Sequence, residues 1–275
     1  MDAAQLPAFL TSGTVEDLMA DAAAPAWGTR AFVEQVMGGP VSVHVRAEDP
    51  RRADIAAAVR RVWDLLHRID AVLSPWRTDS DLLRMRRGEL DAAAAHPWLA
   101  EVRALTDESE RVTGGLFTTD LPAPDGSRGW DPTGLVKGWA GDLAAQVLAG
   151  VPGISYAVNA AGDVRVGVTP GGPRDPWEVG VEDPARPGQM AVVVSLVEGA
   201  LATSGTAARG AHVMDPRVVV DGHPAPATPQ LTSVSVLGPT LTWADAWATA
   251  SLLDPGALAA AGPAWAAYRV VSRTV

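Results

Sequence analysis

The chain has 275 residues, of which 47% are hydrophobic and 20% charged, and its formal net charge at pH 7 is -10. This composition is typical of a soluble globular protein, and the acidic balance argues against non-specific nucleic-acid binding, which needs a basic face. The absence of cysteine excludes disulfides, thiolate metal sites and cysteine nucleophiles. Because no stretch approaches about eighteen consecutive apolar residues and no signal peptide is recognisable, we expect a cytoplasmic protein without a membrane span.

The first half of the chain is predicted to hold one β-hairpin and several helices. Residues 1–30 are expected to form a weakly ordered or helical arm, ahead of a domain over residues 31–275. Alternating apolar and polar residues around a Gly-Gly-Pro break predict two strands joined by a tight turn. Apolar residues at helical spacing predict helices over residues 52–70, 98–112 and 135–150. A short helix capped by Asp79 or Ser80 is predicted between the first two.

The second half is predicted to be rich in strands. Period-two or fully apolar patterns bounded by Gly and Pro lie at residues 155–168, 176–184, 189–205, 231–241 and 268–275. One further helix, Trp243 to Leu253, is expected between the last two, and residues 169–176 and 220–230 are expected to be turn-rich connections. Helices first and strands later, with some interleaving, favour an α+β fold.

The segment "WDPTGLVKGW", residues 130–139, is unusual for a helix start. Pro132, Thr133 and Gly134 leave backbone N–H groups free at the positive end of the helix. Lys137 adds a cation against the helix dipole, which suggests that an anion binds there. The plain alternative is an ordinary capped helix with a solvated lysine.

The segment "GALATSGTAARGAHVMDP", residues 199–216, ends an apolar run in Thr203-Ser204-Gly205, where small residues allow a ligand to approach the backbone. His212 and Asp215 follow, three residues apart. On the pattern alone, a structural histidine and an ordinary Ser-Gly turn are the more common interpretations.

The segment "TWADAWATA", residues 242–250, carries an acid in an apolar helix. Thr242 is predicted to cap the helix, which would put Asp245 in the first turn, where negative charge is favoured, with Thr249 one turn later. The alternative is a site for a hard cation, because carboxylate, hydroxyl and carbonyl oxygens suit Mg²⁺ or Ca²⁺.

Taken in order, these segments resemble the ApbE family of FAD:protein FMN transferases. The resemblance begins at "VMGGPVSVHV" and continues through "LSPWRTDSDLLRM", "TGGLFTTD", "DPTGLVKGWAGD" and "NAAGDVRVGV". It ends with "LATSGTAARGAHVMDP" and "ADAWATA". The chain departs from the family's usual residues at Gly39, where Thr is usual, at Ala161, where Gly is usual, and at Arg217-Val218-Val219, where Arg-Thr-Gly is common.

The resemblance implies an α+β protein with mixed or antiparallel sheets flanked by helices, and two interleaved subdomains with an FAD groove between them. It also implies Mg²⁺-dependent transfer of FMN from FAD to a Ser or Thr hydroxyl of an acceptor flavoprotein, with release of AMP. FAD and the acceptor would be the partners, and neither nucleic acid nor a membrane is expected.

Carried over by position, the resemblance also assigns roles to residues. Asp245 and Thr249 would bind the metal, with the backbone carbonyl of Val136 as a third oxygen. His212 would be the base for the attacking hydroxyl, and Asp215 would orient its imidazole. The groove would be lined by Met37, Trp76, Asp131, Thr133, Gly134, Lys137, Ala202, Thr203, Ser204 and Gly205.

Two other functions stay open at this point. An FAD pyrophosphatase would use water in place of the acceptor hydroxyl and release FMN and AMP. A non-catalytic FAD-binding protein is compatible with the departures at Ala161 and Arg217-Val218-Val219.

Overall fold

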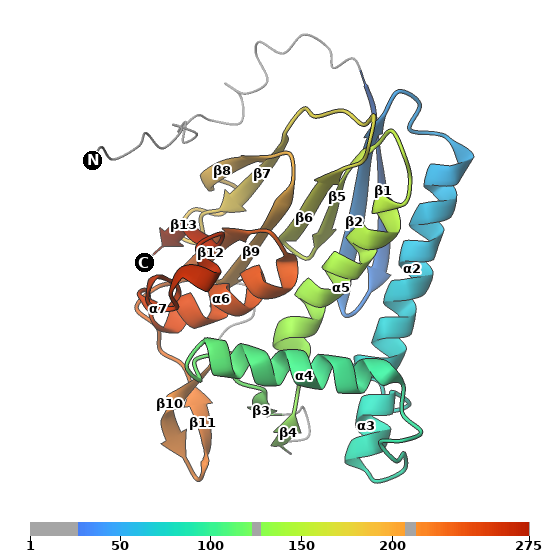
Figure 1. The fold of residues 1–275 in the computed structure, drawn as a ribbon. Helices are drawn as coiled ribbons and strands as arrows, with labels where there is room; N and C mark the ends of the chain where they lie inside the picture. The colour runs from blue at the N-terminus through green and yellow to red at the C-terminus, as the bar shows by residue number, and fades with distance from the viewer. Residues whose placement is uncertain (1–26, 123–127, 207–212, 275) are drawn as a thin grey trace.

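The computed structural model describes residues 27–122, 128–206 and 213–274. Its centre is a seven-stranded antiparallel sheet with the strand order β1-β2-β5-β6-β9-β12-β13 (Figure 1). Segments from both halves of the chain therefore meet in one sheet. Its strands are β1 (Gly28–Val36), β2 (Gly39–Ala47), β5 (Ser155–Ala160), β6 (Asp163–Val168), β9 (Gly199–Gly205), β12 (Ser233–Gly238) and β13 (Arg269–Thr274).

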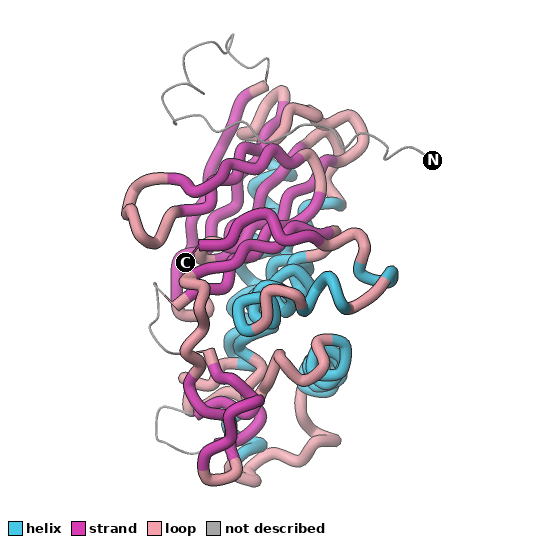
Figure 2. Tube along the Cα trace, turned by 90° about the vertical axis from the view of Figure 1, so that its left-hand side faces the viewer, coloured by secondary structure: helices cyan, strands magenta, loops and turns pink. Residues whose placement is uncertain are grey.

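Helices cover one face of this sheet. α2 (Ala53–Leu73), α5 (Thr133–Ala149) and α6 (Leu241–Leu253) pack against the strands and, in sequence, against one another. In the view of Figure 1, α4 (Pro97–Val112) crosses below them, with α3 (Asp81–Arg86) at its end. Two short helices, α7 (Ala257–Ala260) and η1 (Pro263–Trp265), follow α6. Figure 2 shows the strands on one side of the molecule and the helices on the other. None of the helices in the described residues is long and apolar enough to cross a membrane.

A β-hairpin covers the opposite face of the sheet. It consists of β7 (Trp177–Glu182) and β8 (Met190–Leu196), whose inward valines and Leu196 pack on Val164 and Val166 of β6. The Trp177 indole N–H donates to the Ser155 hydroxyl at 2.8 Å, which fixes the start of the hairpin to β5. The alternating burial of β7 is the expected pattern for a strand with one face on a core.

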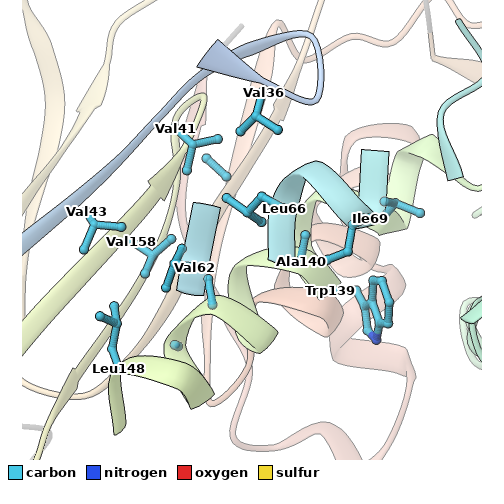
Figure 3. Close-up of a cluster of buried hydrophobic side chains, with 14 of the residues drawn as sticks. Val36, Val41, Val43, Val62, Leu66, Ile69, Trp139, Ala140, Leu148 and Val158 are labelled. Atoms are coloured by element: carbon cyan, nitrogen blue, oxygen red, sulfur yellow. The ribbon is translucent and has the colours of Figure 1, made fainter. Parts of the chain in front are cut away.

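The largest apolar core lies between the sheet and the helices (Figure 3). Val43 of β2 and Val158 of β5 face Val62 and Leu66 of α2, and Leu148 of α5 closes the same cluster. Because apolar residues recur on one face of α2, that helix buries a continuous stripe and leaves most of its charged residues exposed to solvent.

The predicted α+β fold is confirmed. All four long helices and the first β-hairpin lie where the sequence patterns predicted them, with ends that differ by a few residues. Ser80 caps α3, as one of the two predicted candidates, since its hydroxyl accepts from the Leu83 N–H at 3.2 Å. Residues 1–26 of the predicted arm lie outside the described residues. β1 begins at Gly28, so the first strand starts within the last residues of the predicted arm of residues 1–30.

Two stretches predicted without strands contain short hairpins. β10 (Met214–Val220) pairs with β11 (His223–Pro226), so the prediction of a connection over residues 220–230 was wrong for its first part. Likewise β3 (Asp120–Pro122) pairs with β4 (Arg128–Trp130). The prolines and glycines that suggested loops are accommodated because these are isolated two-stranded pairs rather than central strands.

Candidate functional site

A cavity of about 700 Å³ lies where the second half of the sheet meets the start of α5 and the inner face of α6. Its floor is polar and comes from three elements that are far apart in the sequence: the first turns of α5, the end of β9 and the middle of α6. Its wall includes the β5–β6 turn and the far end of the β7–β8 hairpin. The floor residues are Thr133, Gly134, Lys137, Thr203, Ser204, Gly205, Asp245 and Thr249.

The first turn of α5 is held open toward the cavity by Asp131. This buried carboxylate accepts from the Thr133 N–H at 2.9 Å, while the Asp131 N–H donates to the Thr119 carbonyl at 2.8 Å. Gly134 packs closely on Phe117, since a Cβ there would lie 3.3 Å from the Phe117 ring. Asp131 therefore shapes the start of α5 from behind, and Thr133 and Gly134 face the cavity.

Lys137 forms an ion pair with Asp163, the first residue of β6. The Asp163 side chain is only 1% exposed, and its Oδ1 accepts from the Thr203 N–H at 2.9 Å. The cation that opposes the α5 dipole therefore already has an anionic partner within the protein. Lys137 nevertheless lines the cavity, so its charge also acts on a ligand there.

Hydroxyl groups link β9 to its neighbours at the cavity floor. The Thr203 hydroxyl bonds to that of Ser235 on β12 at 2.8 Å, and the Ser204 hydroxyl bonds to that of Thr249 on α6 at 2.9 Å. Ala202, in contrast, is buried in the core beneath the cavity and does not line it. The three residues after Ala202 thus present side chains or backbone to the cavity.

The prediction that Thr242 caps the helix expected over residues 243–253 was wrong. α6 begins at Leu241, and its cap comes from α5: the Asp142 carboxylate accepts from the N–H groups of Leu241 at 2.9 Å and Thr242 at 2.8 Å, and from the Thr242 hydroxyl at 2.6 Å. Asp245 therefore lies beyond the first turn, buried and facing the cavity, with Thr249 one turn later. The capping explanation of Asp245 is lost with this shift.

The other predicted residues lie around or away from the cavity. Met37 lines a second cavity of about 190 Å³, which shares Lys137 and Ala161 with the first. Val136 is buried and does not line the large cavity, and Trp76 is 71% exposed outside it. His212 lies outside the described residues.

Asp215 is held by a neighbouring arginine at the start of β10. Arg217 donates to both carboxylate oxygens, at 2.9 and 2.8 Å, and this lowers the pKa of Asp215 below its usual range. A second bond, from Arg217 to the Leu253 carbonyl at 3.0 Å, ties β10 to the end of α6. Asp215 is thus an ionised acid with a strong partner of its own.

A model of the ApbE family matches residues 124–268, which is more than half of the chain. That span contains every residue of the polar floor described above. The chain belongs to the ApbE family.

Solved ApbE structures are similar to this chain over most of its length. The apo form of the Pseudomonas stutzeri flavinyl transferase ApbE is 22% identical, with a TM-score of 0.65 over 85% of this chain and 87% of that one. The flavin transferase ApbE from Vibrio cholerae is 20% identical, with a TM-score of 0.65 over 86% and 90%. The ApbE protein from Thermotoga maritima is 21% identical, with a TM-score of 0.63 over 83% and 88%. At these identities the likeness shows the fold. A comparison with curated proteins gave no match.

Two of the departures from the usual ApbE residues meet in space. A Cβ built on Gly39 would lie 3.9 Å from the Ala161 methyl group. Gly39 is the first residue of β2, and Ala161 lies in the β5–β6 turn. Ala161 has a φ of 53°, a left-handed conformation that favours glycine. Ala161 lines both cavities, so this departure from the usual glycine lies at a position that the two cavities share.

Sequence reasoning missed two acids that organise this ApbE site. Asp142 and Asp163 both belong to segments that carried the resemblance, yet neither was assigned a role. Their partners, Leu241 with Thr242 and Lys137 with Thr203, are distant in the sequence. Only the isolated position of each acid beside apolar residues offered a signal.

Proposed function

We propose that the protein transfers FMN from FAD to a Ser or Thr hydroxyl of an acceptor flavoprotein, with Mg²⁺ bound and AMP released. The observation that carries the proposal is the buried Asp245 carboxylate beside the Thr249 and Ser204 hydroxyls, on the floor of a cavity that also receives Lys137. Membership of the ApbE family supports the reaction type.

The size and charge of the cavity suit FAD. Its volume of about 700 Å³ lies within the range of small-molecule and cofactor sites. Lys137 and the start of α5 supply positive potential at one end for a diphosphate. Glu182 and Asp183 line the hairpin wall, where hydrogen bonds from the Ala185 N–H and Arg186 lower the pKa of Asp183, and the described residues that line this wall include no Lys or Arg. The diphosphate would therefore bind at the α5 end.

The donor set fits a hard cation that takes few protein ligands. Asp245 offers carboxylate oxygens and Thr249 a hydroxyl, both suited to Mg²⁺. Within the described residues, no three His, Cys, Asp or Glu side chains cluster in a way that could hold a metal alone. Phosphate oxygens of FAD and water would complete such a shell, as is usual for Mg²⁺. When bound, the ion would neutralise charge that develops on the diphosphate.

The chain's own residues would divide the remaining work. Lys137 would orient the diphosphate, and the small Thr203–Gly205 segment would let it approach the backbone. We assign the base to His212, because an imidazole near neutral pH suits deprotonation of an alcohol. Asp215 stays the proposed orienting group, although its described partner is Arg217.

The test combines FAD, Mg²⁺ and a flavoprotein with a Ser or Thr flavinylation motif. We expect a covalent FMN adduct on the acceptor by mass spectrometry and one AMP for each adduct by chromatography. AMP and FMN released from FAD alone, with no adduct on any acceptor, would favour the pyrophosphatase. Tightly bound FAD with no AMP formed over hours would instead identify a non-catalytic FAD-binding protein.

A further inference from the structure

Asp163 contacts two sides of the cavity floor without lining the cavity itself. Its Oδ2 pairs with the Lys137 ammonium group on α5, and its Oδ1 accepts from the Thr203 N–H on β9 at 2.9 Å. These two contacts use both oxygens of a side chain that is 1% exposed. The carboxylate is thus a buried junction between the helix that carries the cation and the strand that carries the Thr-Ser-Gly segment.

The β5–β6 turn fixes where this carboxylate lies. Gly162, with a φ of 102°, precedes Asp163, and its N–H donates to the Asn159 side-chain oxygen at 2.8 Å. Ala160 and Asp163 then pair across the hairpin. A buried carboxylate tolerates neither loss of its cation nor loss of its hydrogen bonds. Lys137 and Thr203 are therefore held in one arrangement before any ligand enters.

We infer that Asp163 is a positioning residue for the proposed reaction: it holds the Lys137 ammonium group and the Thr203–Gly205 segment in place around the FAD diphosphate. The inference rests on the proposed function for the identity of the ligand. Asp163 also opposes the attraction of Lys137 for an anion, because its negative charge is adjacent to that ammonium group. It therefore lowers affinity for the diphosphate while it raises the rate of the bound complex.

The decisive experiment is a double-mutant cycle with Asp163→Asn, Lys137→Met and the double variant. Asn keeps an oxygen for the Thr203 N–H but removes the charge that holds Lys137. Single-turnover AMP release with Mg²⁺ is expected to fall about 10- to 100-fold in Asp163→Asn, the scale of a misplaced group. The Kd for FAD without Mg²⁺, measured by flavin fluorescence, is expected to stay equal or fall by about threefold at low salt, and this gain should shrink as salt rises.

Coupling separates positioning from a general structural role. In the Lys137→Met background, Asp163→Asn should change the rate less than twofold, because the group that it positions is gone. Equal rate losses in both backgrounds, or a rate loss explained by weaker FAD binding alone, would overturn the inference. Asp70→Asn is the matched control. Asp70 is a partly buried acid that pairs with Arg77, with 3.5 Å between the charged atoms, and neither residue lines the cavity. Its rate and Kd should match the wild type.

Two further measurements apply if a variant does not fold or if the proposed function fails. If Asp163→Asn does not fold, Lys137→Met alone carries the test: a lowered unfolding midpoint supports the buried pair, and an unchanged midpoint contradicts it. If wild-type protein neither releases AMP nor modifies an acceptor, the proposed function fails. The FAD-binding cycle then still decides whether Asp163 and Lys137 act together.

Discussion

α2 and α6 cover the same face of the sheet, yet they differ in where their charged residues lie. α2 buries one apolar stripe, from Ile55 to Leu73, and exposes acids and arginines such as Asp64 on its other side. α6 is buried on nearly every side, with only Trp243 and Thr249 partly accessible, and it still contains an acid. Every charged residue of α2 therefore lies off its buried stripe, whereas Asp245 is buried within α6.

This difference shows where function is to be sought in the fold. A buried carboxylate lowers stability unless something at its position favours the charge. On α6 the carboxylate faces the cavity beside two hydroxyls, so the helix carries chemistry as well as packing. The following variants test that contrast between the two helices, from the largest expected effect to the smallest.

Asp245→Asn is expected to lower turnover by about 100- to 1,000-fold, because it removes the carboxylate proposed to bind the cation. The amide has nearly the same volume, so the unfolding free energy should change by no more than about 1 kcal/mol. Steady-state AMP release and thermal unfolding check the two parts.

The control on the other helix is Asp64→Asn, at an exposed position of α2. It should leave both turnover and unfolding unchanged, within about 0.5 kcal/mol for the latter. If Asp245→Asn were equally silent, α6 would be a packing helix like α2, and the proposed metal site would have to be abandoned.

Asp142→Ala is expected to lower the unfolding free energy by about 3 kcal/mol, because it leaves two N–H groups of α6 and the Arg165 guanidinium without their acceptor. α2 differs, since its N-cap residue makes no side-chain cap and its own Asp54 accepts from the Ile55 N–H at 2.8 Å. Urea unfolding provides the measurement. Asp107→Ala, which removes an exposed acid from α4, is the control and should cost less than about 0.5 kcal/mol. A similar small loss for Asp142→Ala would show that α6 does not need this cap.

The contrast also explains how much could be predicted. The periodicity of α2 located it to within a few residues, because one face is apolar and the other charged. α6 has no such periodicity, and its start was placed two residues late with Thr242 as the cap. The true cap, Asp142, lies on another helix, and spacing along one helix cannot reveal a partner from another.

The candidate site was predictable in its parts rather than in its connections. The segments that hold Lys137, Ser204 and Asp245 were selected from the sequence, and the fold brings them to one cavity. Trp76 and Ala202 were selected by the same resemblance but do not line it. An ordered set of motifs predicts which segments form a site. The direction of each side chain depends on the backbone geometry, which the motifs do not specify.

Gly138→Ala tests the close contact that lets α6 be buried. A Cβ at Gly138 would lie 2.8 Å from the Leu241 carbonyl oxygen and 3.1 Å from the Thr242 Cα, so the two helices would have to move apart. Such overpacking should cost about 1–3 kcal/mol of unfolding free energy, and turnover should fall because Asp245 moves with α6. Gly150→Ala is the control, since its nearest contact would be 3.5 Å and its φ is -76°. Equal stability of the two variants would show that the contact between α5 and α6 can accommodate an extra methyl group.

Asp54→Asn on α2 should have the smallest effect, and its pH dependence identifies the cause. Asp54 lies in the first turn of α2, where a hydrogen bond from Arg52 lowers its pKa below the unfolded value. The stabilisation is therefore fully present above the unfolded pKa of about 3.9 and is lost as the pH falls through the folded pKa. Because the side chain is 51% exposed, the difference from wild type should be about 0.5 kcal/mol or less at pH 7 and vanish in acid. Turnover should not change at any pH at which the protein stays folded, because Asp54 does not line the cavity and its partner is Arg52 at the start of the same helix. A loss of AMP release in this variant would contradict the contrast with Asp245.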